Sequence, residues 1–454
     1  MDILIAGDDT VALTIAEALI PTQQVVFIHP PGWHNIRLEK LGVETVVGPI
    51  SSRDTLTKAH PETCSVFVAC TGNDDENIVA CLAARHLGAK RTICVLSRSG
   101  FEGSEDDDTL ADYLGVDVVV RPSEQLSAEI IRIATIHGAL DIEFLANGRV
   151  TLLRYLVEDG APITDGPISE IKLPRNVTLV MNKRGDKIAI PRGGTRIQSG
   201  DKITAIGTPR GIRKLLARQL RVETTKELEQ SATIVGAGVV GLNVARGLEA
   251  AGWTLKIIES DLERCKEIAP LLPKSLVLHG DGTDMEVIED EHVGNDPVLI
   301  AVTDNDEKNL LVSMMARSLG VKRIITRATR LTNEKLFERV GIDVVRSAHG
   351  AVIRAVVRDV VDPRQEIRAE LEHGDIRVLE LTLPDKYPKI SLQEIQTGLF
   401  SNVGAVVRGR KVIIARGNTV LHPRDHLFVF CKPEDEQRCR DAYINPGQTT
   451  EEVL

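Results

Sequence analysis

The sequence predicts an α/β protein in which two doubly wound parallel-sheet units are each followed by a small β-rich α+β domain. Short apolar runs alternate with helical patterns over the first ~130 residues of each half, which is the order expected of parallel strands joined by helices. A glycine-rich loop joins one of these strands to the helix after it. The chain also repeats itself, so the same architecture is expected twice.

Four segments of the first half recur in the same order in the second half, at offsets that drift between 226 and 232 residues. The matching pairs are 5–12 with 234–241, 71–77 with 303–309, 84–91 with 316–323, and 114–119 with 340–345. Residues 195–201 likewise correspond to 419–425, so the small domain is duplicated too. The expected domains are 1–138 and 231–360 for the parallel sheets, 139–222 and 361–454 for the small domains, and 223–230 for a linker.

The strands of the second parallel sheet are expected as continuous Val, Ile and Leu runs, which suit strands buried on both faces. These runs are 233–235, 255–258, 275–278, 298–302, 323–326 and 343–345. In the small domains the expected strands are separated by turn signals such as Lys183–Asp186. They are 177–181, 187–190 and 202–206, with counterparts at 405–407, 411–414 and 427–430.

An amphipathic helix follows each predicted parallel sheet. Leu126, Ile130 and Ile133 share one helical face in the first copy, as do Val352 and Val356 in the second. Such a helix either covers the core of its own unit or crosses over and packs on a neighbouring unit. Periodicity alone does not distinguish these two interpretations.

Residues 233–241 combine the end of a predicted strand, a G-x-G-x-x-G spacing and the start of a helical pattern. One glycine allows a tight turn, one lets the backbone approach a pyrophosphate, and one lets the helix pack closely on the strand. The helix N-terminus offers N–H groups and partial positive charge to phosphates. The residues expected at the ligand are Gly236, Ala237, Gly238, Val239, Val240 and Gly241. The alternative is a Rossmann-like unit that only folds.

Glu259 ends the next predicted strand, 18 residues after Gly241. An acid at this place hydrogen-bonds ribose hydroxyls and favours a free 2′-hydroxyl, which disfavours NADPH. It does not separate NAD(H) from ATP or ADP, since all of these carry the same adenosine ribose.

Composition excludes several classes of protein. The 454 residues carry a formal net charge of −10, which argues against sequence-independent nucleic-acid binding. No apolar run reaches the ~18 residues of a membrane span, and residues 3–5 already form a predicted strand, so we expect no signal peptide. The seven cysteines are interpreted as small core residues of a reducing compartment rather than metal ligands or disulfides.

The glycine loop, the acid, the His279–Gly282 segment and the Thr303–Asn309 segment together resemble tandem RCK modules (regulators of K⁺ conductance). Among these, the chain is similar to the peripheral regulatory subunits of Trk potassium-uptake systems. The resemblance places further nucleotide contacts at Gly280, Asp281, Thr303, Asp304 and Asn305. Arg327 is a further candidate for a phosphate contact, with an inter-subunit salt bridge as the alternative.

The resemblance implies a regulator without catalysis, located in the cytoplasm on the inner face of the membrane. It implies a homo-oligomeric ring, built as a dimer or tetramer, beneath a potassium-translocating subunit of the TrkH or TrkG type. NAD(H), with ATP or ADP possible at the same site, would shift the ring between shapes by binding one of them more tightly. No metal and no nucleic acid are implied.

Two other classes of function are weaker. A dehydrogenase needs a positioned acid or base, and no His–carboxylate or Lys–carboxylate pairing stands out. A nucleotide-sensing transcription factor needs a helix-turn-helix and a basic face, and neither is evident in the sequence.

The first copy departs from the glycine pattern. Its loop retains Gly7 but continues with Asp8, Asp9, Thr10 and Val11, and Asp9 stands where the second copy has Gly238. A carboxylate at the close-approach position repels phosphate. The first copy is therefore expected either to bind nucleotide more weakly or with another selectivity, or to serve only as a structural unit.

Other positions of the first copy are mixed. His29 replaces the strand-end acid and is interpreted as a surface-loop histidine, although it retains the ability to hydrogen-bond a ribose. Thr71, Gly72 and Asn73 match the later segment of the second copy, and Arg98 aligns near Arg327. These four residues are the remaining candidates for nucleotide contacts in the first copy.

Overall fold

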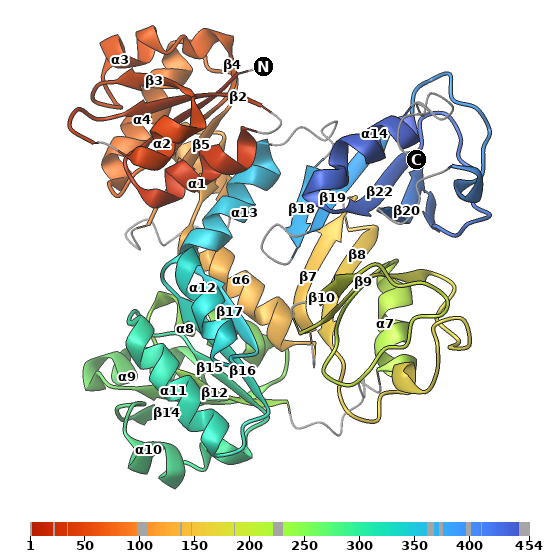
Figure 1. The fold of residues 1–454 in the computed structure, drawn as a ribbon. Coiled ribbons are helices and arrows are strands. Elements are labelled where there is room, and N and C mark those ends of the chain that lie inside the picture. Colours follow the sequence, from red (N-terminus) through yellow and green to blue (C-terminus); the bar gives the residue numbers. More distant parts are fainter. Residues whose placement is uncertain are drawn as a thin grey trace. The chain divides into compact units, whose positions relative to one another are not determined.

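The computed structural model describes residues 2–20, 23–33, 35–97, 107–136, 139–146, 148–185, 187–220, 230–360, 367–371, 376–395, 401–409 and 411–444. The chain forms two compact units, and each is assembled from two separated stretches of sequence (Figure 1). One unit combines 1–131 with 230–361, and the other combines 132–229 with 362–454. Both parallel sheets therefore belong to one unit and both antiparallel sheets to the other.

The first parallel sheet has the order β3-β2-β1-β4-β5-β6, the doubly wound order that the sequence predicts. Its strands are β1 Asp2–Gly7, β2 Gln24–His29, β3 Glu44–Val47, β4 Cys64–Cys70, β5 Thr92–Val95 and β6 Val118–Val120. Its helices are α1 Thr10–Leu19, α2 Ile36–Leu41, α3 Arg53–Lys58, α4 Asp74–His86, α5 Asp107–Leu114 and α6 Pro122–Ala134.

The second parallel sheet repeats this order as β14-β13-β12-β15-β16-β17. Its strands are β12 Ser231–Val235, β13 Thr254–Glu259, β14 Leu276–His279, β15 Val298–Ala301, β16 Arg323–Ala328 and β17 Val344–Ser347. Its helices are α8 Val239–Ala250, α9 Leu262–Ile268, α10 Met285–Asp290, α11 Asp306–Ser318, α12 Leu331–Arg339 and α13 Ala348–Val360. All six strands expected from the Val, Ile and Leu runs are present.

Helices cover both faces of these sheets, which explains why the strands are apolar throughout. Successive side chains of a strand point to opposite faces. Ile3 and Ile5 of β1 accordingly pack with α1, whereas Leu4 and Ala6 pack in a separate core with α4.

The amphipathic helices cross over between the two copies. Val352 and Val356 of α13 are buried in the same core as Val11 and Ile15 of α1, so α13 of the second copy covers the first (Figure 1). The crossover interpretation of α13 is therefore confirmed. Glu129 of α6 receives hydrogen bonds of 2.9 and 2.6 Å from Arg354, which links the crossover helices of the two copies.

The small domains contain the antiparallel sheets β10-β9-β11-β8-β7 and β18-β19-β22-β20-β21. The first comprises β7 Ala139–Leu145, β8 Val150–Leu156, β9 Val177–Arg184, β10 Lys187–Ala189, β11 Lys202–Gly207 and helix α7 Pro209–Gln219. The second comprises β18 Ile367–Leu371, β19 Ile376–Thr382, β20 Ser401–Arg408, β21 Lys411–Ile414, β22 His426–Cys431 and helix α14 Glu436–Ile444. These sheets, with the two parallel ones, confirm the predicted fold class.

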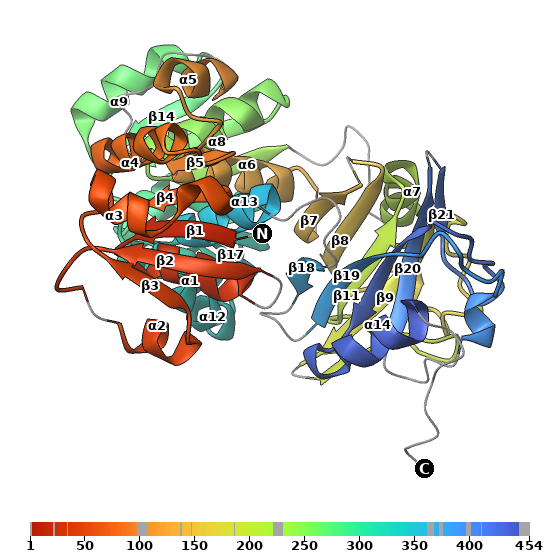
Figure 2. The same cartoon turned by 90° about the horizontal axis from the view of Figure 1, so that it is seen from above.

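The two antiparallel sheets pack against each other within their unit. Val180 and Ile206 of the first sheet share a buried core with Ala405, Phe428 and Phe430 of the second, and Figure 2 shows β9 and β11 beside β20. Strand β8 was not predicted because it is buried on both faces: Leu152 lies in this shared core and Leu153 in the core of its own domain. It therefore lacks the alternation that marks a half-buried strand.

All seven cysteines are buried thiols outside any disulfide, which confirms their interpretation as core residues. Within the described ranges, the structure contains no helix with the length and apolar character needed to cross a membrane.

Candidate nucleotide-binding site

The predicted site residues of the second copy gather at the carboxyl edge of its parallel sheet. The strand order reverses between β12 and β15, and ligands of such sheets bind in the crevice at this switch point. The glycine loop follows β12, Glu259 ends β13, and Thr303 follows β15. The fold thus brings residues far apart in sequence to one edge.

The three glycines meet three different geometric demands. Gly236 has φ +97°, a left-handed conformation, and a Cβ there would lie 2.9 Å from the backbone nitrogen of Thr303. A Cβ on Gly241 would lie 1.9 Å from the carbonyl oxygen of Gly236, so helix and loop approach as closely as glycine permits. A Cβ on Gly238 would meet nothing within 4 Å among the described residues, so this position is open.

Among the described residues, the N-cap of α8 provides no side chain to satisfy the first N–H groups of the helix. Its N-cap residue is Gly238, which is exposed and makes no side-chain cap. Backbone N–H groups in the first turn of a helix have no partner within the helix, and with the helix dipole they attract anions. The first turn of α8 therefore offers N–H groups of the kind that bind phosphate, at a position where Gly238 adds no side chain.

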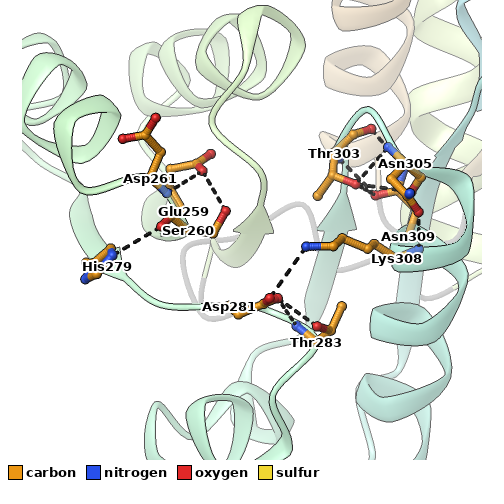
Figure 3. A network of polar contacts seen from close by, with 10 residues as sticks. All are labelled: Glu259, Ser260, Asp261, His279, Asp281, Thr283, Thr303, Asn305, Lys308 and Asn309. Atoms are coloured by element: carbon orange, nitrogen blue, oxygen red, sulfur yellow. Dashed lines mark hydrogen bonds and ion pairs between the residues drawn. The ribbon is translucent and has the colours of Figure 1, made fainter.

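Glu259 is tied to the glycine loop itself. Its Oε2 accepts a 2.7 Å hydrogen bond from the N–H of Ala237. Its Oε1 accepts bonds from Ser260 and from the N–H of Asp261, at 3.3 and 3.0 Å (Figure 3). The sequence predicts a contact with ribose for this carboxylate. The structure adds that the same carboxylate positions the loop.

The Thr303–Asn309 segment is held by a buried asparagine. Asn309 Oδ1 accepts hydrogen bonds from the N–H and the hydroxyl of Thr303, and its Nδ2 donates to the carbonyl oxygen of Thr303 (Figure 3). The same Nδ2 also donates to the carbonyl oxygen of Arg327. Asn309 therefore joins the ends of β15 and β16. Asn305 caps α11 by accepting from the N–H of Lys308 at 2.8 Å, and Asp304 is exposed at the edge.

The first copy contains the same asparagine arrangement. Asn77 Oδ1 accepts from the N–H and hydroxyl of Thr71, and its Nδ2 donates to the carbonyl oxygens of Thr71 and Val95. Asn73 caps α4, and Gly72 is exposed. In both copies this asparagine links the ends of two neighbouring strands. Its presence in the first copy is therefore explained by its role in the fold and does not require nucleotide binding there.

Gly280 and Asp281 lie beyond β14. The N–H of Gly280 donates to the carbonyl oxygen of Glu259 at 2.9 Å. Asp281 accepts from the N–H and hydroxyl of Thr283, which lower its carboxyl pKa, and its Oδ2 lies 3.5 Å from Lys308 Nζ (Figure 3). Asp281 is therefore held as an anion beside a cationic side chain.

Three basic residues border the site, two of which the sequence analysis did not single out. Arg327 Nη1 donates to the carbonyl oxygen of Thr303 at 3.1 Å, and its buried Nε meets no hydrogen-bond acceptor within the described part of the chain. Burial lowers the pKa of Arg327. Arg264 Nε donates to the carbonyl oxygen of Ala237 at 2.9 Å, and Lys308 approaches Asp281. Arg264 lies in α9, the helix directly after Glu259, and Lys308 lies in α11, the helix directly after Thr303. These positions in the sequence could have identified both residues as neighbours of the site.

The first loop is closed by its own carboxylate. Asp9 is the N-cap of α1, and its Oδ1 accepts 2.9 Å hydrogen bonds from the N–H groups of Val11 and Ala12. These are the groups that a phosphate would need. Burial raises the Asp9 pKa, and the two hydrogen bonds partly offset this effect. Asp8 is half-buried beside Asp9, and Thr10 is exposed.

The interpretation of His29 as a surface-loop residue is wrong. His29 ends β2, is 8% exposed, and lies 5.3 Å from the ring of Trp33, which itself stacks on Phe27 at 5.7 Å. Its Nδ1 lies 3.1 Å from the carbonyl oxygen of Pro30. Aromatic packing draws the imidazole inward, an effect that the following Pro-Pro sequence does not reveal. Arg98 lies outside the described residues.

Comparison with protein families identifies both kinds of domain. The TrkA-N domain matches residues 3–122 and 232–348, and the TrkA-C domain matches 152–219 and 377–442. A TrkA homolog of the Trk potassium uptake system from Archaeoglobus fulgidus is 29% identical over 98% of this chain and 100% of its own length. TrkA homolog 2 from Methanosarcina mazei is 30% identical over 95% of this chain and 97% of its own.

Solved structures agree on the fold. The GsuK channel bound to NAD superposes with a TM-score of 0.59 at 18% identity and covers 97% of this chain, which in turn covers 78% of that one. The GsuK RCK domain gives a TM-score of 0.58 at 18% identity, with 97% and 94% of the two chains covered. At 18% identity, these structures establish the fold of this chain. Which ligand the chain binds has to be argued from the residues of its own site.

Proposed function

Because the chain belongs to the TrkA family of Trk system potassium uptake proteins, we propose that it is a nucleotide-binding regulatory subunit of a membrane potassium transporter. The observation that carries the proposal is the difference between the two glycine loops. The second has an exposed glycine at the start of α8, whereas the first has a carboxylate already bound to the start of α1.

The proposed ligand is NAD(H), with ATP or ADP as alternatives at the same site. Gly238 and the first turn of α8 receive the phosphates, and Glu259 receives the ribose. A carboxylate repels a 2′-phosphate, so NADPH is expected to bind more weakly than NADH. The solved GsuK channel, similar in fold, is described as bound to NAD, which agrees with this choice.

The proposed action is allosteric rather than catalytic. At the site edge, the polar groups of Thr303 and Asn309 already bond to one another and to the backbone, which leaves them poorly suited to proton transfer. The nucleotide stabilises one arrangement of a homo-oligomeric ring, dimeric or tetrameric in chains. That ring acts from the cytoplasmic side on a potassium-translocating subunit of the TrkH or TrkG type.

Calorimetric titration of the purified chain with NADH, NAD, ATP, ADP and NADPH tests this proposal. We expect one site per chain, weakest for NADPH. Gly238→Asp, which copies Asp9 into the second loop, is expected to abolish that binding, whereas Asp9→Asn is the matched control and should leave it intact. Two sites per chain, or full affinity in Gly238→Asp, would contradict the assignment. Turnover of NADH with a small carbonyl substrate would contradict the regulatory role.

A further inference from the structure

Helix α7 of the first small domain has one apolar face that is buried and one basic face that is exposed. Ile212, Leu215 and Leu216 lie in the core of the domain and pack on the first antiparallel sheet (Figure 1). The exposed positions of α7 follow the helical spacing i, i+3, i+4, i+7 and i+8. They are Arg210, Arg213, Lys214, Ala217 and Arg218. All of them except Ala217 are cations, and we call these four bases the basic face of α7.

Neighbouring carboxylates do not neutralise the basic face. Within the described part of the chain, no Asp or Glu forms an ion pair or a hydrogen bond with any of its four bases. The exposed Lys172 and Arg175 lie in the segment that borders α7. Gln219 of α7 donates to the carbonyl oxygen of Lys172 at 3.1 Å, and the N–H of Thr208 donates to that of Asn176 at 3.1 Å. Positive charge therefore continues beside the helix.

The corresponding helix of the second small domain, α14, has no such face. At the offset of 224 that aligns 195–201 with 419–425, the four bases of the basic face correspond to Glu434, Gln437, Arg438 and Ala442. The bases of α14 are also paired, because Arg438 lies 3.3 Å from Asp435 and Arg440 donates to Glu436 at 2.7 Å. The fold of a small domain therefore does not require a basic helix at this place.

The chemistry of the basic face favours a diffuse anionic surface over a protein partner. The centre of a protein interface is depleted in charge and contains aromatic or large apolar anchors, whereas the uncharged exposed residue of α7 is Ala217. The net charge of −10 argues against nucleic acid. Anionic lipid headgroups require only positive charge, and each Lys or Arg near such a surface contributes about fivefold in affinity.

We propose that the basic face of α7 binds the anionic phospholipid headgroups of the membrane. The apolar face of α7 is already buried in its own domain, so the helix lies on the headgroups without inserting among the acyl chains. This contact adds lipid as a partner to the membrane transporter proposed above, and it does not depend on nucleotide. Each chain of an oligomer brings one basic face, so contacts that are weak singly act together.

Co-sedimentation of the full chain with vesicles tests this proposal. Wild-type protein is expected to sediment with vesicles of phosphatidylglycerol and phosphatidylcholine, but not with phosphatidylcholine alone. One variant removes the basic face while keeping residues that suit a helix: Arg210→Gln, Arg213→Gln, Lys214→Gln and Arg218→Gln. Its binding is expected to fall about tenfold or more.

The matched control makes the same change of net charge at four exposed bases of the second small domain, and it should bind like the wild type. Its substitutions are Lys386→Gln, Lys389→Gln, Lys411→Gln and Arg416→Gln. A folded α7 variant that binds anionic vesicles like the wild type overturns the proposal, and so does a control that loses as much binding as the α7 variant.

A salt titration of the unmodified chain gives a second test. Added salt screens exposed charges and is expected to release the chain from anionic vesicles, so binding that persists at high salt overturns the proposal. A chain that binds polyglutamate or single-stranded RNA but not the vesicles assigns the basic face to another partner and also overturns it. NADH affinity should be unchanged in the α7 variant. A wild-type chain that binds the vesicles but no NADH supports the lipid contact and contradicts only the nucleotide site.

Discussion

The carboxylate of Glu259 accepts a 2.7 Å hydrogen bond from the N–H of Ala237, in the middle of the glycine loop. One residue at the end of β13 thus holds the loop after β12 in place, across the point where a nucleotide is proposed to bind. Removal of this carboxylate is expected to disturb the site in two ways, by loss of the ribose contact and by release of the loop.

Glu259→Ala is expected to weaken NADH binding about 10- to 100-fold, since a hydrogen bond to a charged group contributes about 1.5–3 kcal/mol. Calorimetry or NADH fluorescence measures the loss. His29→Asn changes the corresponding position of the first copy and is the control, with no change expected. Weakened binding in the control together with normal binding in Glu259→Ala would place the site in the first copy.

Gly238→Ala and Gly241→Ala are expected to separate binding from folding. A Cβ on Gly241 would lie 1.9 Å from the Gly236 carbonyl oxygen, so this variant should lose about 1–3 kcal/mol of stability as α8 shifts. A Cβ on Gly238 meets open space, so that variant should melt like the wild type but lose phosphate binding. Thermal denaturation and NADH titration of both proteins check this, and equal melting temperatures would refute the packing argument.

Asp9→Asn is expected to increase stability at neutral pH. Burial raises the Asp9 pKa in the folded state, so the folded protein binds this proton more readily than the unfolded chain does. The ionised carboxylate therefore destabilises the fold progressively as pH rises from about 3.8, its unfolded value, through the folded pKa. Asparagine keeps the cap without the charge. Denaturation curves from pH 3 to 8 should show an advantage for Asn that vanishes at low pH; an advantage independent of pH would contradict this.

Asp201 is expected to stabilise the first small domain. It is fully buried, and it accepts bonds of 2.6 and 2.7 Å from Arg184 and one of 2.9 Å from the N–H of Gln198. Burial alone would raise its pKa, but these bonds together lower it. Asp201→Ala should cost about 2–3 kcal/mol, because it removes these bonds and also the acceptor of the buried Asn182 amide, which donates to Asp201 at 3.2 Å. Asp385→Ala removes an exposed Asp–Arg pair and is the control, with an unchanged urea midpoint expected.

Much of the fold was predictable because its signals are local. The strand runs of the parallel sheets, the glycine spacing around Gly236 and the repeat all depend on neighbouring residues, and the structure contains each of them. The burial of His29 was missed although Phe27 and Trp33 lie close to it in sequence, because only the conformation of the chain between His29 and Trp33 brings the Trp33 ring against the imidazole. The bond from Ala237 to Glu259 was not predictable either, because it joins the glycine loop after β12 to the end of β13, 22 residues away.

By itself the sequence determined the fold class, the duplication and the difference between Gly238 and Asp9, since strand periodicity and glycine geometry act over a few residues. Only the tertiary structure decided that α13 covers the first copy and that Asp9 itself caps α1. The physical reason is that periodicity makes one face of a helix apolar without specifying which surface will bury it. The sequence also does not show whether Asp9 would only repel a phosphate or would itself accept the hydrogen bonds of the helix N-terminus, as it does in the structure.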